Sequence, residues 1–428
     1  MYIRSLVQIA FLFTPIYVSA ADQAGLAQQS GAQAYMNSAY FAQWGIWARK
    51  FPPDSLPTNQ LSNVLYAFLD IKKDGTVYRF SHDEFADLGT QGPTGAARNV
   101  EAKGSIGRLF SLKRKNRKMK VMLSIGGWTY SQAQASPASS SYYGVAANQT
   151  STRERFAKTA VEFVKDWGLD GIDVDWEYPT TPDEGRNYVL LLKEIRKELD
   201  SYAKEHAPGY KFLLSIAAPT AKEKLQIADL SQLDFLDFIN LMTYDFTGSF
   251  STKTGHASNL YPSQSNMNST PFNIAGAVQE YISSGFPATK ISLGIPLYGH
   301  AFGQTGGLGQ TFTKSQEGSF GEAGFWDYKD LPRDGTVVSY DEEAHASYSH
   351  SGSNTELVSF ETPRTVKEKA KYVKDRGLAG CFFWQASSDK KNDESLIKTT
   401  YDVLQQAGWT NNNLNYPISK YTNIRQGS

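Results

Sequence analysis

Short apolar stretches alternate with longer amphipathic stretches along most of this chain. The short apolar stretches predict eight strands: 39–44, 63–69, 120–125, 171–177, 212–217, 238–244, 291–295 and 380–384. Between them lie segments with apolar residues at helical spacing, among them 105–116, 152–167, 184–206, 272–284 and 363–376. Strands that alternate with helices predict a parallel sheet, and eight of them predict a closed (β/α)8 TIM barrel.

The alternation breaks once, between the seventh and eighth strands. Residues 299–362 contain no clear amphipathic helix but do contain Gly-rich and strand-like pieces, such as 336–340 and 356–360. We interpret this segment as an α+β subdomain inserted after the seventh strand. The catalytic barrel is then expected to comprise residues 39–298 and 363–428.

The fourth strand has an unusual pattern of charge. Its alternation places three carboxylates on one face and three bulky apolar side chains on the other: Asp173, Asp175 and Glu177 against Ile172, Val174 and Trp176. The apolar face must be buried against helices, so the acidic face also lies inside the barrel. Three neighbouring carboxylates cannot all ionise there cheaply, which favours a catalytic role over a solvated edge strand. Asp170 is out of phase with the others and is expected to organise the start of the strand.

The segment D-G-I-D-V-D-W-E at 170–177 resembles the D-x-x-D-x-D-x-E signature of family 18 glycoside hydrolases, the chitinases. Other strand ends resemble the same family. The third ends in S-I-G-G-W at 124–128, the sixth in N-L-M-T-Y-D at 240–245, and the eighth in F-W at 383–384. The resemblance runs from about residue 39 to the end and is strongest to secreted fungal endochitinases.

The resemblance implies a substrate-assisted, retaining mechanism, in which the N-acetyl oxygen of the sugar attacks its own anomeric carbon. Glu177 would be the general acid and then the base, and Asp175 would align the acetamido group. Asp173 could share a proton with Asp175, and Tyr244 could donate to the acetamide oxygen. The substrate-binding residues that the resemblance implies are Trp44, Trp128, Met242, Asp245, Tyr298, His300 and Trp384.

Two positions depart from the family pattern. His300 stands where the family usually has Arg, and Gln385 stands where related fungal chitinases often have Glu. Since the charge of His changes near neutral pH, we expect weaker or pH-dependent binding on the non-reducing side of the substrate. Gln385 could alter the pH optimum or leave it unchanged.

The composition excludes several classes of partner and predicts the compartment. Lys plus Arg and Asp plus Glu both number 43, so nothing in the net charge indicates nucleic acid or an anionic membrane. Residues 1–20 have the layout of a secretory signal peptide, and 21–38 resemble a poorly ordered leader. Cys381 is the only cysteine, so no intrachain disulfide can form. Sequons at Asn148 and Asn268 could carry glycans in a eukaryotic host. We expect a secreted monomer without cofactor or metal.

Three functions fit the predicted barrel. A chitinase acting on chitin and chitooligosaccharides is favoured, because the match covers the whole chain and the insertion would deepen a groove for a linear polymer. An endo-β-N-acetylglucosaminidase acting on N-glycans shares the mechanism, and its products from a glycoprotein would distinguish it. A chitin-binding lectin on the same barrel is disfavoured, because such proteins have lost the acid.

Overall fold

The computed structural model describes residues 34–79, 84–89, 100–133, 142–225, 227, 232–351, 356–405 and 409–427. The expected signal peptide and residues 21–33 of the expected leader lie outside these ranges. The leader was expected to extend to residue 38, and this was wrong for its last residues. Met36 and Ser38 already belong to the first strand, where they pair with Gly380 and Phe382. Backbone pairing with the eighth strand therefore begins three residues before the apolar run.

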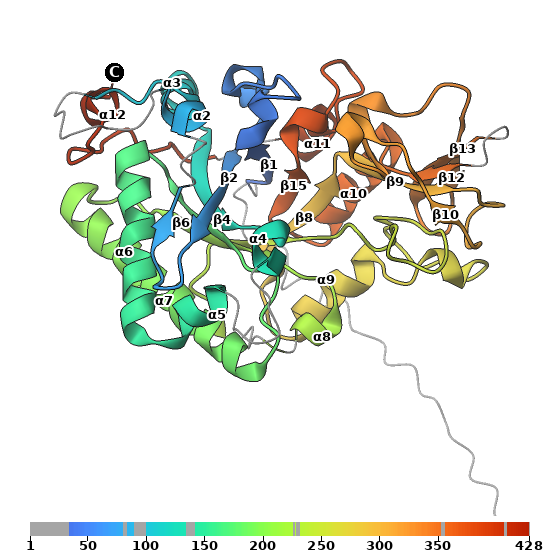
Figure 1. The fold of residues 1–428 in the computed structure, drawn as a ribbon, viewed down its shortest axis with the longest axis horizontal. Coiled ribbons are helices and arrows are strands. Elements are labelled where there is room, and N and C mark those ends of the chain that lie inside the picture. Colours follow the sequence, from blue (N-terminus) through green and yellow to red (C-terminus); the bar gives the residue numbers. More distant parts are fainter. Residues whose placement is uncertain are drawn as a thin grey trace, which may run out of the picture. The chain divides into compact units, whose positions relative to one another are not determined.

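Eight parallel strands form a closed barrel, as predicted (Figure 1). Neighbouring strands follow the order β1-β15-β8-β7-β6-β5-β4-β2, and β1 pairs with β2 to close the ring. The strands are β1 (Met36–Ala42), β2 (Asn63–Ile71), β4 (Lys120–Gly126), β5 (Gly171–Asp175), β6 (Leu213–Ala218), β7 (Phe238–Leu241), β8 (Ile291–Pro296) and β15 (Gly380–Trp384). A two-residue strand, β3 (Val77–Tyr78), pairs antiparallel with β2.

Helices follow the strands, and hydrogen-bonding side chains determine where several of them begin. The predicted helix 184–206 starts two residues earlier, because Thr181 accepts a hydrogen bond from the Glu184 N–H and Pro182 follows the cap. Asn273 caps a second helix in the same way. The helices are α2 (Glu84–Leu88), α3 (Ser105–Lys115), α4 (Trp128–Ala133), α5 (Tyr142–Asn148), α6 (Thr150–Trp167), α7 (Pro182–His206), α8 (Lys222–Leu225), α9 (Ile274–Ser283), α10 (Pro363–Asp375), α11 (Leu396–Leu404) and α12 (Thr422–Gln426).

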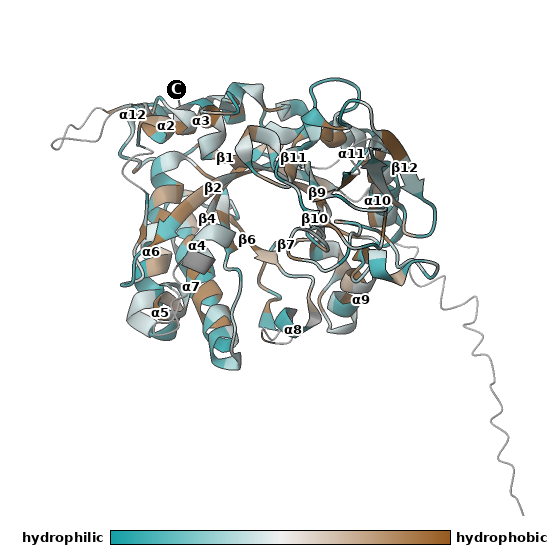
Figure 2. Ribbon diagram, turned by 45° about the vertical axis from the view of Figure 1, so that its right-hand side comes forward, coloured by the Kyte–Doolittle hydropathy of each residue, from teal (hydrophilic) through white to brown (hydrophobic). Residues whose placement is uncertain are grey.

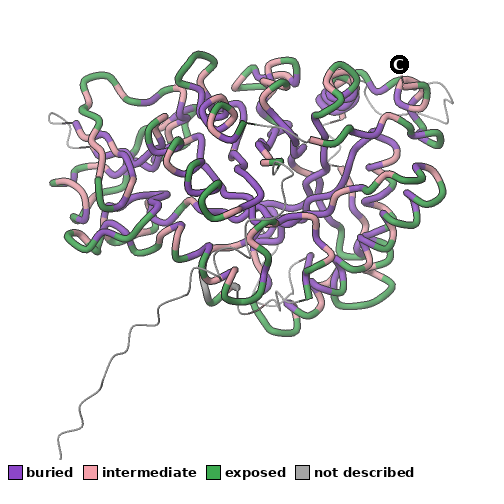
Figure 3. The backbone as a smooth tube through the Cα atoms, turned by 180° about the vertical axis from the view of Figure 1, so that it is seen from behind, coloured by how far each residue is buried: buried purple, intermediate pink, exposed green. Residues whose placement is uncertain are grey.

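The main core lies between the barrel and its helices. Figure 2 shows hydrophobic colouring along β2, whereas α7 carries both hydrophobic and hydrophilic residues. Figure 3 shows long buried stretches through the middle of the fold and exposed stretches mainly along its periphery. Ile172, Val174 and Trp176 belong to this core, and Trp176 stacks on Tyr143 with ring centroids 5.2 Å apart. The outward face of the fourth strand is therefore buried, as its alternation predicts.

The insertion after β8 contains an antiparallel sheet beside the barrel (Figure 1). Its strand order is β10-β9-β14-β13-β12, with β11 paired to β9. The strands are β9 (Tyr298–Gly303), β10 (Thr313–Lys314), β11 (Phe325–Asp327), β12 (Val337–Asp341), β13 (Ala346–His350) and β14 (Leu357–Ser359). The strands confirm the β part of the expected α+β subdomain. Over its described residues, the helical part consists only of 3-10 turns at Ser319–Gly321 and Tyr328–Asp330.

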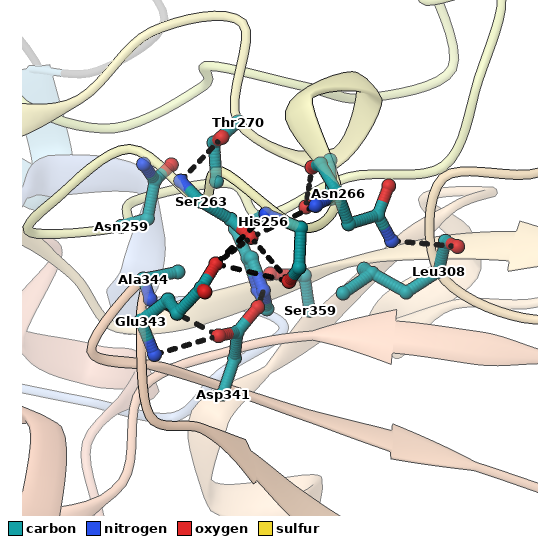
Figure 4. Close-up of polar contacts among 12 residues, drawn as sticks. His256, Asn259, Ser263, Asn266, Thr270, Leu308, Asp341, Glu343, Ala344 and Ser359 are labelled. Atoms are coloured by element: carbon teal, nitrogen blue, oxygen red, sulfur yellow. Dashed lines mark hydrogen bonds and ion pairs between the residues drawn. The ribbon is translucent and has the colours of Figure 1, made fainter.

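The loop that follows β7 is attached to this insertion by polar contacts (Figure 4). Glu343 accepts hydrogen bonds from the Ser263 and Ser265 hydroxyls and from two backbone N–H groups of the loop. These bonds lower the pKa of Glu343, because they favour its ionised form. His256 lies 3.1 Å from the Asp341 carboxylate. The loop and the insertion therefore hold each other at one edge of the barrel.

The chain's carboxyl-terminal segment is attached beneath the barrel, at the amino end of the fourth strand. Asp170 accepts hydrogen bonds from the backbone N–H groups of Val121 and Asn413 and forms a buried ion pair of 2.8 Å with Lys113. The Tyr416 hydroxyl donates to the carbonyl of Leu169 at 2.6 Å. Asp170 thus organises the start of the strand, as its phase predicts. At the surface, the sequon asparagines at 148 and 268 are both exposed.

Candidate active site

Asp173 is the deepest of the three carboxylates that share the inner face of β5. It is fully buried, and donors from four other barrel strands surround it. Its Oδ2 accepts from the Tyr40 and Ser124 hydroxyls at 2.8 Å, and its Oδ1 accepts from Ser215 at 2.7 Å and Asn240 at 3.3 Å. Burial raises the pKa of Asp173, whereas the four donors favour its ionised form.

Asp175 is one step nearer the carboxyl-terminal rim and lacks such support. Only 5% of it is exposed, and its Oδ1 has no hydrogen-bond partner among the described residues. Burial, followed by the negative charges of Glu177 and Asp173, raises the pKa of Asp175 well above its usual range. A proton is therefore held on this inner face. Asp175 Oδ1, next to it, can accept a hydrogen bond from a ligand.

Glu177 lies just beyond the end of β5, which stops at Asp175 rather than at residue 177 as we expected. It is 8% exposed, and burial raises its pKa to about 7, with a smaller contribution from the charge of Asp245. The Tyr178 hydroxyl donates to its Oε2 at 3.1 Å, which acts in the opposite direction. A carboxyl group with this pKa can both give and take a proton near neutral pH.

Aromatic side chains surround the inner end of this site. Trp384, at the end of β15, stacks on Phe68 with centroids 5.5 Å apart and meets Tyr40 edge to face at 5.3 Å. Met242 belongs to the same small cluster, which lies inside the barrel and is separate from the main core. The structure therefore brings Met242 and Trp384 together near the inner face of the barrel.

A second group of polar side chains lies in the segment after β7 and on β9. Asp245 accepts a hydrogen bond from the Tyr298 hydroxyl at 2.5 Å and lies 2.7 Å from Nε2 of His300. His300 is only 2% exposed, so any effect of this ring on a ligand would be transmitted by Asp245. Tyr244 contacts Tyr298, and burial raises its pKa well above its usual range, so its hydroxyl stays protonated. Gln385 is also buried and accepts a hydrogen bond from Ser387.

The paired glycines at the end of β4 let the backbone pass close to β5. Gly126 has a φ of +108°, and a Cβ atom there would lie 2.3 Å from the carbonyl oxygen of Asp175. A Cβ atom on Gly127 would lie 2.7 Å from the Phe68 ring. Trp128 follows directly and is 57% exposed, and Trp44 on the segment after β1 is 40% exposed. Both indoles therefore present apolar surface at the rim.

Sequence reasoning missed several side chains of this site. Tyr178 contacts the acid directly, but it is adjacent to the acidic motif and was not given a role. Ser215 and Asn240 are single polar residues within otherwise apolar strands, and that contrast is the signal that could have identified them. Over the described ranges, no group of three or more His, Cys, Asp or Glu side chains could hold a metal ion. No helix in those ranges is long and apolar enough to cross a membrane.

Known proteins resemble this chain in sequence and in fold. "Chitinase 1" of Aphanocladium album is 44% identical over 99% of this chain and 97% of its own length. "Endochitinase 1" of Metarhizium robertsii is 46% identical over 92% of this chain and 91% of its own length. Among solved structures, chitinase ChiA74 from Bacillus thuringiensis superposes with a TM-score of 0.77 at 26% identity, over 88% of this chain and 71% of that one. Residues 37–389 match Glycosyl hydrolases family 18, and the chain belongs to this family.

Proposed function

We propose that this protein is a secreted chitinase, which hydrolyses the β-1,4 bonds of N-acetylglucosamine polymers with retention of configuration. The observation that carries the proposal is that two different carboxyl groups lie two residues apart at the end of one strand. Burial raises the pKa of Glu177 to about 7, and Asp175 Oδ1 has no hydrogen-bond partner among the described residues. Relatives named chitinase and endochitinase support chitin as the substrate. The apolar run at residues 1–20 supports export.

In the first step, protonated Glu177 gives its proton to the glycosidic oxygen. The sugar on the non-reducing side of this oxygen carries the anomeric carbon. Its own acetamido oxygen attacks that carbon as the bond to the leaving sugar breaks, and an oxazolinium ion forms. Asp175 Oδ1 accepts the acetamido N–H, which aligns the attacking oxygen and balances the positive charge. The Tyr244 hydroxyl, which stays protonated, donates to the acetamide oxygen.

In the second step, the Glu177 carboxylate takes a proton from water. The water oxygen attacks the anomeric carbon, opens the oxazolinium ring and leaves a β-anomer as product. Glu177 is then protonated again and ready for the next bond. The Tyr178 hydroxyl, which donates to Glu177 Oε2, keeps the carboxyl group oriented through both steps. Trp384 supplies the flat apolar surface beneath the sugar whose bond is broken.

The test of this proposal is hydrolysis of a defined chitin oligosaccharide with the product anomers followed by NMR in real time. We expect cleavage, with the β-anomer formed first. An α-anomer as first product would contradict the substrate-assisted mechanism even if chitin is the substrate. Binding without cleavage by the folded protein would favour the lectin, and release of N-glycans from a glycoprotein without cleavage of chitin would favour an endo-β-N-acetylglucosaminidase.

We expect His300→Arg to tighten the binding of chitin oligosaccharides. The reason is that an Arg carries a permanent positive charge and two-point donors beside Asp245, which His300 Nε2 contacts at 2.7 Å. Affinity would be measured by calorimetry at several pH values. His206→Arg, at the far end of α7, is the matched control. Unchanged affinity in His300→Arg would refute this role.

A further inference from the structure

Arg49 joins the segment after β1 to the insertion after β8. Its guanidinium makes a two-point contact with Asp327 on β11, from Nε to Oδ2 at 3.2 Å and from Nη2 to Oδ1 at 3.1 Å. Nη2 also lies 3.1 Å from Glu322, and the guanidinium packs over the Phe320 ring at 4.7 Å. The Arg49 and Asp327 side chains are 8% and 4% exposed. The pair is therefore shielded from water. A two-point contact in such a place is stronger than one at an open surface.

Lys329 links the Asp327 carboxylate to the segment that follows β15, the strand between β1 and β8. Lys329 Nζ lies 3.1 Å from Asp327 Oδ2 and donates to the carbonyl of Ser387 at 2.9 Å. Ser387 follows β15, which ends in Trp384. Asp327 therefore connects segments that follow three neighbouring barrel strands, β1, β8 and β15.

Each partner of the Arg49–Asp327 pair is linked to a residue of the candidate site. On one side, the segment 43–50 carries Trp44, whose ring lies 6.3 Å from Trp384 and 6.2 Å from Phe68. On the other side, Asp327 is paired in the sheet with Tyr298. The Tyr298 hydroxyl donates to Asp245, the carboxylate whose charge acts on Glu177. The pair thus ties the Trp44 side of the rim to the Tyr298 side.

We propose that Arg49 is a positioning residue that determines affinity for long substrates, because the Arg49–Asp327 pair sets the spacing between Trp44 and Tyr298. This inference rests on the proposed function. A short substrate held at Glu177 and Trp384 needs neither side of the rim in a fixed place. A longer chain contacts both sides at once, and it loses affinity when the two sides can move independently.

The test measures kcat and KM for a chitin disaccharide derivative and for a chitin hexasaccharide. Arg49→Met keeps a long, unbranched side chain but removes the guanidinium group. In this variant, KM for the hexasaccharide is expected to rise about tenfold. The kcat for both substrates and KM for the disaccharide derivative stay within about twofold. Asp327→Asn gives the same pattern, and the double variant is no worse than either single one. Arg49→Lys, which keeps the charge but cannot make the two-point contact, gives an intermediate KM for the hexasaccharide.

Arg155→Met is the matched control, because Arg155 pairs with Asp74 at 3.0 Å on an exposed part of α6. Equal rises in KM for both substrates, or a fall in kcat alone, would overturn the inference, since general loosening of the fold acts on every substrate. An unchanged hexasaccharide KM in both Arg49→Met and Asp327→Asn would overturn it as well. If the wild type cleaves neither substrate, the proposed function itself fails.

Discussion

Glu177→Gln is expected to lower kcat on chitin oligosaccharides by about 10²- to 10⁴-fold, the usual contribution of a positioned general acid. Gln has nearly the same shape, but it cannot give a proton to the glycosidic oxygen or take one from water. The substrate should still bind, because the residues that hold the sugar are unchanged. The rate would be measured on a tetrasaccharide, and binding would be measured by calorimetry on the same variant.

Glu154→Gln, on an exposed position of α6, is the matched control and is expected to keep full activity. Two results would contradict the assignment. Substantial residual activity in Glu177→Gln would mean that another group supplies the proton. Loss of binding together with activity would mean that Glu177 mainly holds the substrate.

The barrel could be predicted because its determinants are local in sequence. The alternation of Asp173, Asp175 and Glu177 with bulky apolar residues indicates a strand that is buried on both faces, and eight such strands alternating with helices predict a closed barrel. Helix ends were predicted less accurately, because caps such as Thr181 precede the amphipathic pattern instead of belonging to it. The strand also ends before Glu177, because backbone pairing stops at Asp175 and leaves Glu177 at the rim.

The surroundings of the acids could not be predicted in the same way. The donors to Asp173 come from strands far apart in the sequence, and only closure of the barrel brings Tyr40 within 2.8 Å of it. Arg49 and Asp327 are 278 positions apart, and nothing near either residue indicates the other. His300 was expected to contact substrate because of its place in a motif, but neighbouring rings, including Phe325, cover it. Burial of a single side chain depends on tertiary packing that the local pattern does not contain.

Glu177→Gln, which is expected to lower activity, should also stabilise the protein above neutral pH. Burial raises the pKa of Glu177 from 4.5 to about 7 in the folded state. Below pH 4.5 the group is protonated in both states and does not disfavour folding. Between pH 4.5 and 7 the unfolded chain loses this proton while the folded chain keeps it, so the free energy of unfolding falls as the pH rises. Above pH 7 the loss reaches a plateau on the order of 3 kcal/mol.

Gln does not ionise, so Glu177→Gln is expected to remove this pH-dependent loss. It also removes the charge that helps to raise the pKa of Asp175, and this change acts in the same direction. Denaturant unfolding of both proteins at pH 4 and pH 8 measures the effect. Their free energies of unfolding should be similar at pH 4 and should differ at pH 8, where the variant is more stable. Equal stabilities at both pH values would mean that burial does not raise the pKa of Glu177 in the folded protein. The site would then not lower the stability of the fold in order to hold a proton near neutral pH.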